Sequence, residues 1–139
     1  MVTVSANGAR LSVAASGVAD VLSPQATPAD SALVVFEVRD GKAATLLGKV
    51  PLPAIPATVV DTGNRILVGF IGADPAVIDP SKVSSGGSAI IGRIPVRAGL
   101  LVGLRPDGRT LFALGAGLFA IVDLDRVPVQ PMASQTAAK

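Results

Sequence analysis

Four aspartates in the second half of the chain have a spacing that could support metal chemistry. Asp79 and Asp123 each end an aliphatic stretch, and Asp74 and Asp125 lie near them. Carboxylate oxygens gathered at strand ends could bind a hard cation such as Ca²⁺. No EF-hand loop surrounds them, and an aspartate at a strand end commonly accepts backbone N–H groups of the following turn. We favour this turn role and predict no metal-ligating residue.

The composition excludes several other kinds of site. The chain has no His, Cys, Trp or Tyr, which removes thiolate nucleophiles, disulfides, histidine acid–base chemistry and the usual zinc sites. A serine hydrolase of the usual kind would need a histidine base and a Gly-x-Ser-x-Gly turn, and neither is present. The Gly-rich stretch Ser84–Ser88 lacks the Gly-Lys-Ser/Thr of a phosphate loop, so we expect a flexible loop there. No catalytic or cofactor-binding residue and no cofactor are predicted.

Basic residues recur near repeated glycines. They are Arg10, Lys49, Arg65, Arg93 and Arg109. Repetition could place them on one anion-attracting rim, but we favour solvation and protection of edge strands from pairing with other chains. Twelve Lys and Arg against ten Asp and Glu leave a net charge of only +2, and the only aromatic residues are four Phe. Nucleic acid is therefore not an expected partner.

The length of 139 residues, half of them apolar, fits one domain with a sizeable core. The longest uncharged apolar run, Leu111–Val122, has 12 residues, whereas a membrane-spanning helix needs about 20. The stretch Leu11–Ala19 is followed by Asp20 and makes a poor signal peptide. We expect a soluble chain without a membrane span. It could be part of an exported protein, and the sequence does not predict its location.

An internal repeat of about 45 residues organises the chain. Two pairs of segments match at an offset of 44: Gly48–Leu52 with Gly92–Val96, and Ala76–Asp79 with Ala120–Asp123. Gly63–Val68 parallels Gly108–Ala113 at an offset of 45. A further copy, Asn7–Val13, precedes the Gly63–Val68 copy by 55 residues. The larger offset of this first copy fits an insertion at Ser23–Ser31. Such a period indicates one supersecondary unit used several times.

Short strands make up each unit. Apolar alternation flanks the dipeptides Asn7-Gly8 and Asp107-Gly108, which is typical of tight hairpins because Asn, Asp and Gly accept positive φ. Thr62-Gly63 is flanked in the same way but is a less ideal turn dipeptide. Further strands are expected at Leu33–Val38, Leu46–Leu52 and Ile90–Val96. Pro51 and Pro95 cannot donate to a strand ladder and are expected on edge strands or at strand ends.

A unit of about 45 residues with four short strands is typical of a propeller blade. We predict a single all-β domain over 1–139, made of about three four-stranded antiparallel units at 2–52, 53–96 and 97–130. The last unit is expected to lack a full fourth strand, and 131–139 to be a flexible tail. The alternative fold is a single β-sandwich or barrel that retains the repeat only as ancestry.

Parts of this repeat resemble the YVTN-type β-propeller repeat of surface-layer-like and lactonase-like propellers. The similar segments are Asp107–Phe112, Ile121–Leu124 and Gly92–Val96. The aromatic-Val-Thr-Asn strand of that family is replaced by Leu11–Ala14, Ile66–Gly69 and Leu111–Leu114. The resemblance implies three blades and, as an alternative function, a lactonase-like hydrolase with a divalent cation at the propeller channel. That alternative predicts lactone hydrolysis that is lost with a chelator and with Asp79→Asn or Asp123→Asn.

Three blades are fewer than the 4 to 8 that typically close a propeller. An open arc leaves apolar inter-blade faces in water, and patches of this kind usually mark an interface. We therefore expect a non-enzymatic structural or binding module, a partial propeller that self-assembles or belongs to a larger propeller. We expect the chain to form a homo-oligomer, and we favour a dimer because two copies would supply about six blades.

Overall fold

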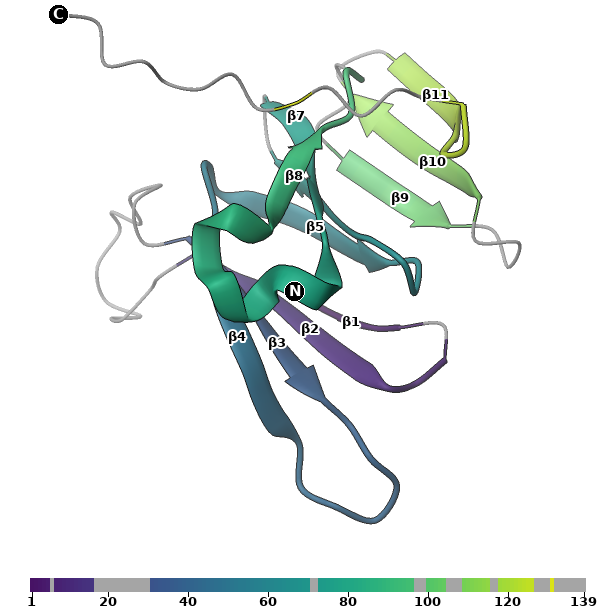
Figure 1. Ribbon diagram of the computed structural model, residues 1–139. Helices are drawn as coiled ribbons and strands as arrows, with labels where there is room; N and C mark the ends of the chain where they lie inside the picture. The colour runs from purple at the N-terminus through teal and green to yellow at the C-terminus, as the bar shows by residue number, and fades with distance from the viewer. Residues whose placement is uncertain are drawn as a thin grey trace, which may run out of the picture.

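The computed structural model describes residues 1–5, 7–16, 31–70, 73–96, 100–104, 109–115, 118–126 and 131, and the described chain is all-β (Figure 1). Its elements are β1 (Val2–Val4), β2 (Arg10–Ala15), β3 (Ala32–Glu37), β4 (Thr45–Pro51), β5 (Pro56–Asp61), β6 (Ile66–Phe70), β7 (Ala73–Ile78), the 3-10 segment η2 (Pro80–Ala89), β8 (Ile90–Arg93), β9 (Leu100–Leu104), β10 (Thr110–Gly115) and β11 (Leu118–Asp123). Within these residues, no helix has the length and apolar character needed to cross a membrane.

The strands form three antiparallel sheets in which sequence neighbours are also hydrogen-bonded neighbours. Sheet 1 is β1-β2-β3-β4, sheet 2 is β5-β6-β7-β8, and sheet 3 is β9-β10-β11. Each sheet lies within one of the three units expected from the repeat. The prediction of four-stranded antiparallel sheets is confirmed, and the described strands form neither the two sheets of a sandwich nor a closed barrel.

Two of the predicted hairpins are confirmed by their register and their glycines. Val4 lies opposite Leu11 across the first turn, and Asp61 opposite Ile66 across the second. Gly8 and Gly63 have φ of 71° and 95°, a region that glycine enters without steric cost. The third dipeptide, Asp107-Gly108, lies outside the described residues, as do 132–139 of the expected tail and most of the Ser23–Ser31 insertion.

Both prolines of the repeated Gly-basic-aliphatic-Pro segment lie where proline is tolerated. The edge strand β4 ends at Pro51, and Pro95 follows the end of the edge strand β8. Proline has no N–H to donate, so an edge or a strand end leaves the ladder intact. The prediction for these two strands is confirmed.

The expectation of a flexible loop at Ser84–Ser88 is wrong, because these residues belong to η2. Asp79 caps the segment by accepting the N–H of Ser81, and Pro80 follows the cap, where proline's fixed φ favours a helical start. Gly86 interrupts the helical conformation with φ 63°. The segment packs along β4, where the side chain of Val83 is buried.

The three sheets stack in chain order, and the first strand of each sheet contacts the next. β5 packs against β1 and β2, and β9 packs against β5 and β6 (Figure 1). Two apolar clusters fill the intersheet spaces. One joins sheets 1 and 2 through residues such as Leu33, Val35, Ile66 and Val68, and the other joins sheets 2 and 3. Burial of these faces is the main stabilising term of the fold.

The interface between sheets 1 and 2 contains an unpaired hydroxyl at Ser12. Its Oγ is fully buried without a hydrogen-bond partner in the described chain. A buried polar group of this kind costs free energy that an apolar side chain avoids. We therefore expect Ser12→Ala to raise the free energy of unfolding by about 1 kcal/mol, measured by urea denaturation. Ser88→Ala is the control, since that exposed hydroxyl already donates to the Ser85 carbonyl. A loss of stability in Ser12→Ala would contradict the prediction.

Candidate functional site

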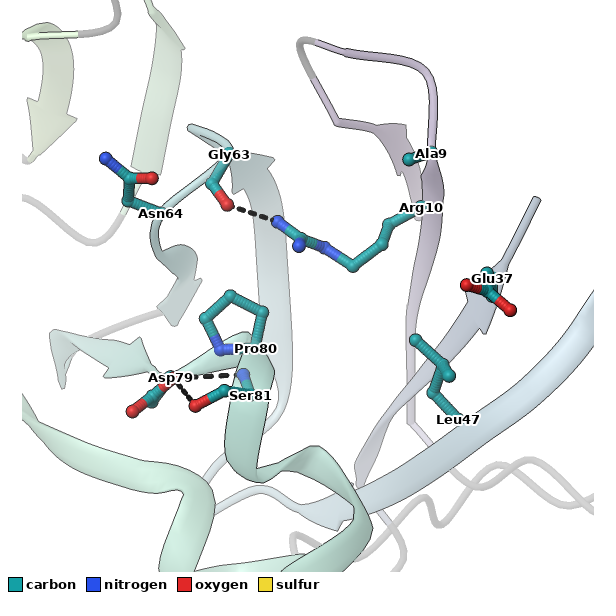
Figure 2. Close-up of a pocket in the computed structure, with 9 residues that line it drawn as sticks. All are labelled: Ala9, Arg10, Glu37, Leu47, Gly63, Asn64, Asp79, Pro80 and Ser81. Carbon is teal, nitrogen blue, oxygen red and sulfur yellow. Dashed lines mark hydrogen bonds between the residues drawn. The ribbon is translucent and has the colours of Figure 1, made fainter. Parts of the chain in front are cut away.

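A charged pair joins sheets 1 and 2 beside the hairpin turns. The Arg10 guanidinium donates from Nε to Asp61 Oδ2 at 3.1 Å and from Nη2 to Asp61 Oδ1 at 2.9 Å. Nη2 also donates to the Gly63 carbonyl at 2.6 Å (Figure 2). The Asp61 side chain is 0% exposed and the Arg10 side chain 18% exposed. A bidentate pair at this depth fixes how sheet 2 sits on sheet 1.

Asp61 also stabilises the turn of its own hairpin, because its Oδ1 accepts the N–H of Gly63 at 2.8 Å. The sequence offered no signal for its pairing with Arg10. The two residues are 51 positions apart, and each has a sufficient local explanation near its own hairpin. Only the stacking of the two sheets brings them together.

An open cleft of about 440 Å³ lies next to this pair, between the ends of sheets 1 and 2 and the start of η2. Arg10, Glu37, Asn64 and Asp79 supply its polar lining, and Leu47 contributes an apolar wall (Figure 2). The charged groups already have partners: Arg10 binds Asp61, and Glu37 binds Arg39 at 3.0 Å. The cleft therefore offers few unsatisfied groups to a ligand.

Asp79 and Asp123 have the turn role that the sequence analysis favoured. Asp79 Oδ1 accepts the Ser81 backbone N–H at 2.9 Å and the Ser81 hydroxyl at 2.6 Å. Asp123 Oδ1 accepts the Asp125 N–H at 3.0 Å. The hydroxyl of Ser81, followed by its backbone N–H, lowers the pKa of the Asp79 carboxyl, because both bonds favour the charged form. This interpretation of both aspartates is confirmed.

The lowered pKa of Asp79 gives a pH-dependent contribution to stability. A carboxyl whose pKa is lowered in the folded state stabilises the fold at any pH above its ordinary pKa of 3.8. That stabilisation is lost as the pH falls through the folded-state pKa. We expect wild type to be more stable than Asp79→Asn at neutral pH, with the difference shrinking below about pH 4. Thermal melts of both proteins between pH 7 and pH 3 measure this. A difference that is constant with pH would contradict it.

The four aspartates form separate ion pairs. Asp74 pairs with Arg93 at 3.4 Å, Asp79 with Lys82 at 3.8 Å, Asp125 with Arg109 at 3.3 Å, and Asp123 with Arg126 at 3.5 Å. Within the described residues, no three acidic, His or Cys side chains are grouped to hold a metal ion. Three of the five repeated basic residues, at 10, 93 and 109, therefore have a carboxylate partner.

The two terminal sheets each carry an apolar outward side. Face 1 is the side of sheet 1 turned away from sheet 2; its residues, aligned by strand register, are Val2, Val4, Leu11, Val13, Val34, Phe36 and Leu46. Face 3 is the side of sheet 3 turned away from sheet 2 and comprises Phe112, Leu114, Phe119 and Ile121. Val2 is 62% exposed and Ile121 is 66% exposed. The same register also places Lys49 of β4 on face 1, opposite Val34, and Asp123 of β11 on face 3, opposite Thr110, and both residues lie on edge strands.

The repeat shows which positions in the middle sheet correspond to face 3. At the offset of 44, Ile121 corresponds to Val77 and Phe119 to Pro75, and both counterparts are fully buried. Phe119 is itself 58% exposed and stacks on Phe112 with ring centroids 6.1 Å apart. The repeat positions that are buried against the next sheet in sheet 2 are therefore exposed to solvent in sheet 3, the last sheet of the stack.

Face 1 has the same relation to the middle sheet in the opposite direction. At the offset of 55, Leu11 corresponds to Ile66 and Val13 to Val68. Ile66 and Val68 are fully buried in the cluster that joins sheet 2 to sheet 1, whereas Leu11 and Val13 are only partly buried. The sequence analysis expected exposed inter-sheet faces in general, and the register identifies their residues.

The chain was compared with protein-family models, with curated proteins and with solved structures, and none of the three comparisons found a match.

Proposed function

We propose that this chain is a non-enzymatic assembly module, a partial β-propeller whose terminal sheets are covered by further sheets in its working state. One observation carries the proposal: positions that are buried between sheets in the middle of the stack, such as Val77, are exposed at its end, as at Ile121. An apolar face of this kind in water favours association.

The sheet arrangement supports the propeller part of the proposal. Each sheet is an antiparallel meander, and successive sheets contact one another through their first strands. Radial repetition of four-stranded meanders around a common centre is the propeller architecture. The repeated hairpins and the edge prolines recur at equivalent positions, as expected for units related by one rotation.

Site-specific thiol labelling tests whether face 3 is covered. The chain contains no cysteine, so a single Ile121→Cys provides a unique probe on that face. As the protein concentration rises from nanomolar to tens of micromolar, we expect the rate of maleimide labelling at this cysteine to fall at least tenfold. The fall should be on the order of the decrease in the monomer fraction, because association covers the thiol. Lys42→Cys in the exposed β3–β4 connection is the control, and its rate should not change. A constant rate at both sites would overturn the proposal.

A further inference from the structure

We infer that face 1 of one copy receives face 3 of a second copy, so that two chains close a ring of six sheets. This inference rests on the proposed function and names the occupant of each face. Inside one chain, the middle sheet turns one side toward the preceding sheet and the opposite side toward the next. Ile66 and Val68 of sheet 2 point to sheet 1, whereas Leu67 and Val77 point to sheet 3.

The repeat positions show which side of the middle sheet each terminal face corresponds to. Leu11 on face 1 corresponds to Ile66, which contacts the preceding sheet. Ile121 on face 3 corresponds to Val77, which contacts the next sheet. The two sheet-to-sheet interfaces of the chain both join unlike sides. A head-to-tail contact between copies therefore continues an interface that the chain already uses twice, whereas contacts of face 1 with face 1 or face 3 with face 3 would have no such precedent.

The side chains of the two faces also differ in size. Face 3 carries the stacked pair Phe112 and Phe119 with the protruding Ile121, and face 1 is dominated by valines, including the exposed Val2 and Val4. Within the chain, the bulky Leu67 shares a cluster with the small Ala113 of the next sheet. Large side chains opposite small ones allow the close packing that protein interiors require.

The number of sheets sets the number of copies. A head-to-tail interface produces a ring when its rotation closes and a filament when it does not. The described residues of each chain supply three sheets, and propellers typically close with 4 to 8 blades. Two copies give six sheets and two identical interfaces, and three copies would exceed the usual range. The ring therefore closes at two chains.

Two single-face variants test this pairing. Val4→Asp places a carboxylate on face 1, and Ile121→Asp places one on face 3. In a head-to-tail ring each variant alone has a charge in both interfaces, so we expect its dissociation constant to rise more than about 100-fold. An equimolar mixture can form one interface free of either charge, and it should recover dimers that dissociate more readily than wild type. Sedimentation velocity measures all four samples.

The control is Ser85→Asp, which adds the same charge at an exposed position on η2 and should dimerise like wild type. Far-UV circular dichroism and thermal melts establish that each variant is folded. If either single-face variant dimerised like wild type, pairing would be between like faces and the inference would fail. A mixture that stays monomeric would also overturn it. A wild-type chain that is monomeric at every concentration would instead remove the proposed function itself.

Discussion

Replacing Arg10 with alanine is expected to lower the free energy of unfolding by about 3–5 kcal/mol, the usual cost of removing one partner from a buried ion pair. The reason is the unequal burial of the two side chains. Asp61 is 0% exposed and depends on Arg10 for two of its hydrogen bonds. Without the guanidinium, the carboxylate stays between two sheets and, among the residues that the structure describes, keeps the Gly63 N–H as its hydrogen-bond donor.

Two further variants make the Arg10 prediction specific. Asp61→Ala should cost less than Arg10→Ala, because the freed guanidinium is already 18% exposed and can turn toward water. Arg39→Ala breaks the exposed pair with Glu37 and should cost less than about 1 kcal/mol. Urea denaturation of the three variants measures the order. Equal, small losses for all three would mean that the Arg10 pair does not hold sheets 1 and 2 together.

The second large effect is expected at Gly48, where β4 meets η2. A Cβ at this position would collide with the backbone carbonyl of Val83, and a backbone atom cannot move aside as the end of a flexible side chain can. Gly48→Ala should therefore cost about 1–3 kcal/mol, the usual cost of overpacking, and the larger Gly48→Val should cost more. Thermal and urea unfolding of both variants measure the loss.

Gly87→Ala is the matched control for Gly48. It lies within η2 itself, and a Cβ there would meet no atom within 4 Å. We expect its stability to stay within about 0.5 kcal/mol of wild type, as for substitutions away from packed features. If Gly48→Ala were as stable as Gly87→Ala, η2 would not lie against β4 in solution.

The hairpins and the sheet pairing could be predicted from the sequence because their causes are local. Gly8 and Gly63 carry the positive φ that a tight turn requires, and apolar alternation on both sides sets the register. The internal repeat showed that these hairpins recur, and its length of about 45 residues predicted units of four strands. For the same reason the turn roles of Asp79 and Asp123 could be inferred from their position after a strand.

The features that were missed depend on contacts between sheets. Ser84–Ser88 has the composition of a loop, and its helical conformation depends on the Asp79 cap and on packing against Gly48. The pairing of Arg10 with Asp61 requires two segments 51 residues apart to meet. Neither contact leaves a pattern in the local sequence, because tertiary packing overrides the preferences of short segments.

The absolute mass of the wild-type chain in solution tests the central claim most directly. Light scattering behind a sizing column, across a range of loading concentrations, gives that mass without assuming a shape. Closure of the two terminal faces by a second copy predicts a discrete species near twice 13.8 kDa that dissociates on dilution. A single species of 13.8 kDa at every concentration would contradict the account, because faces 1 and 3 would then remain in water without a second copy to cover them.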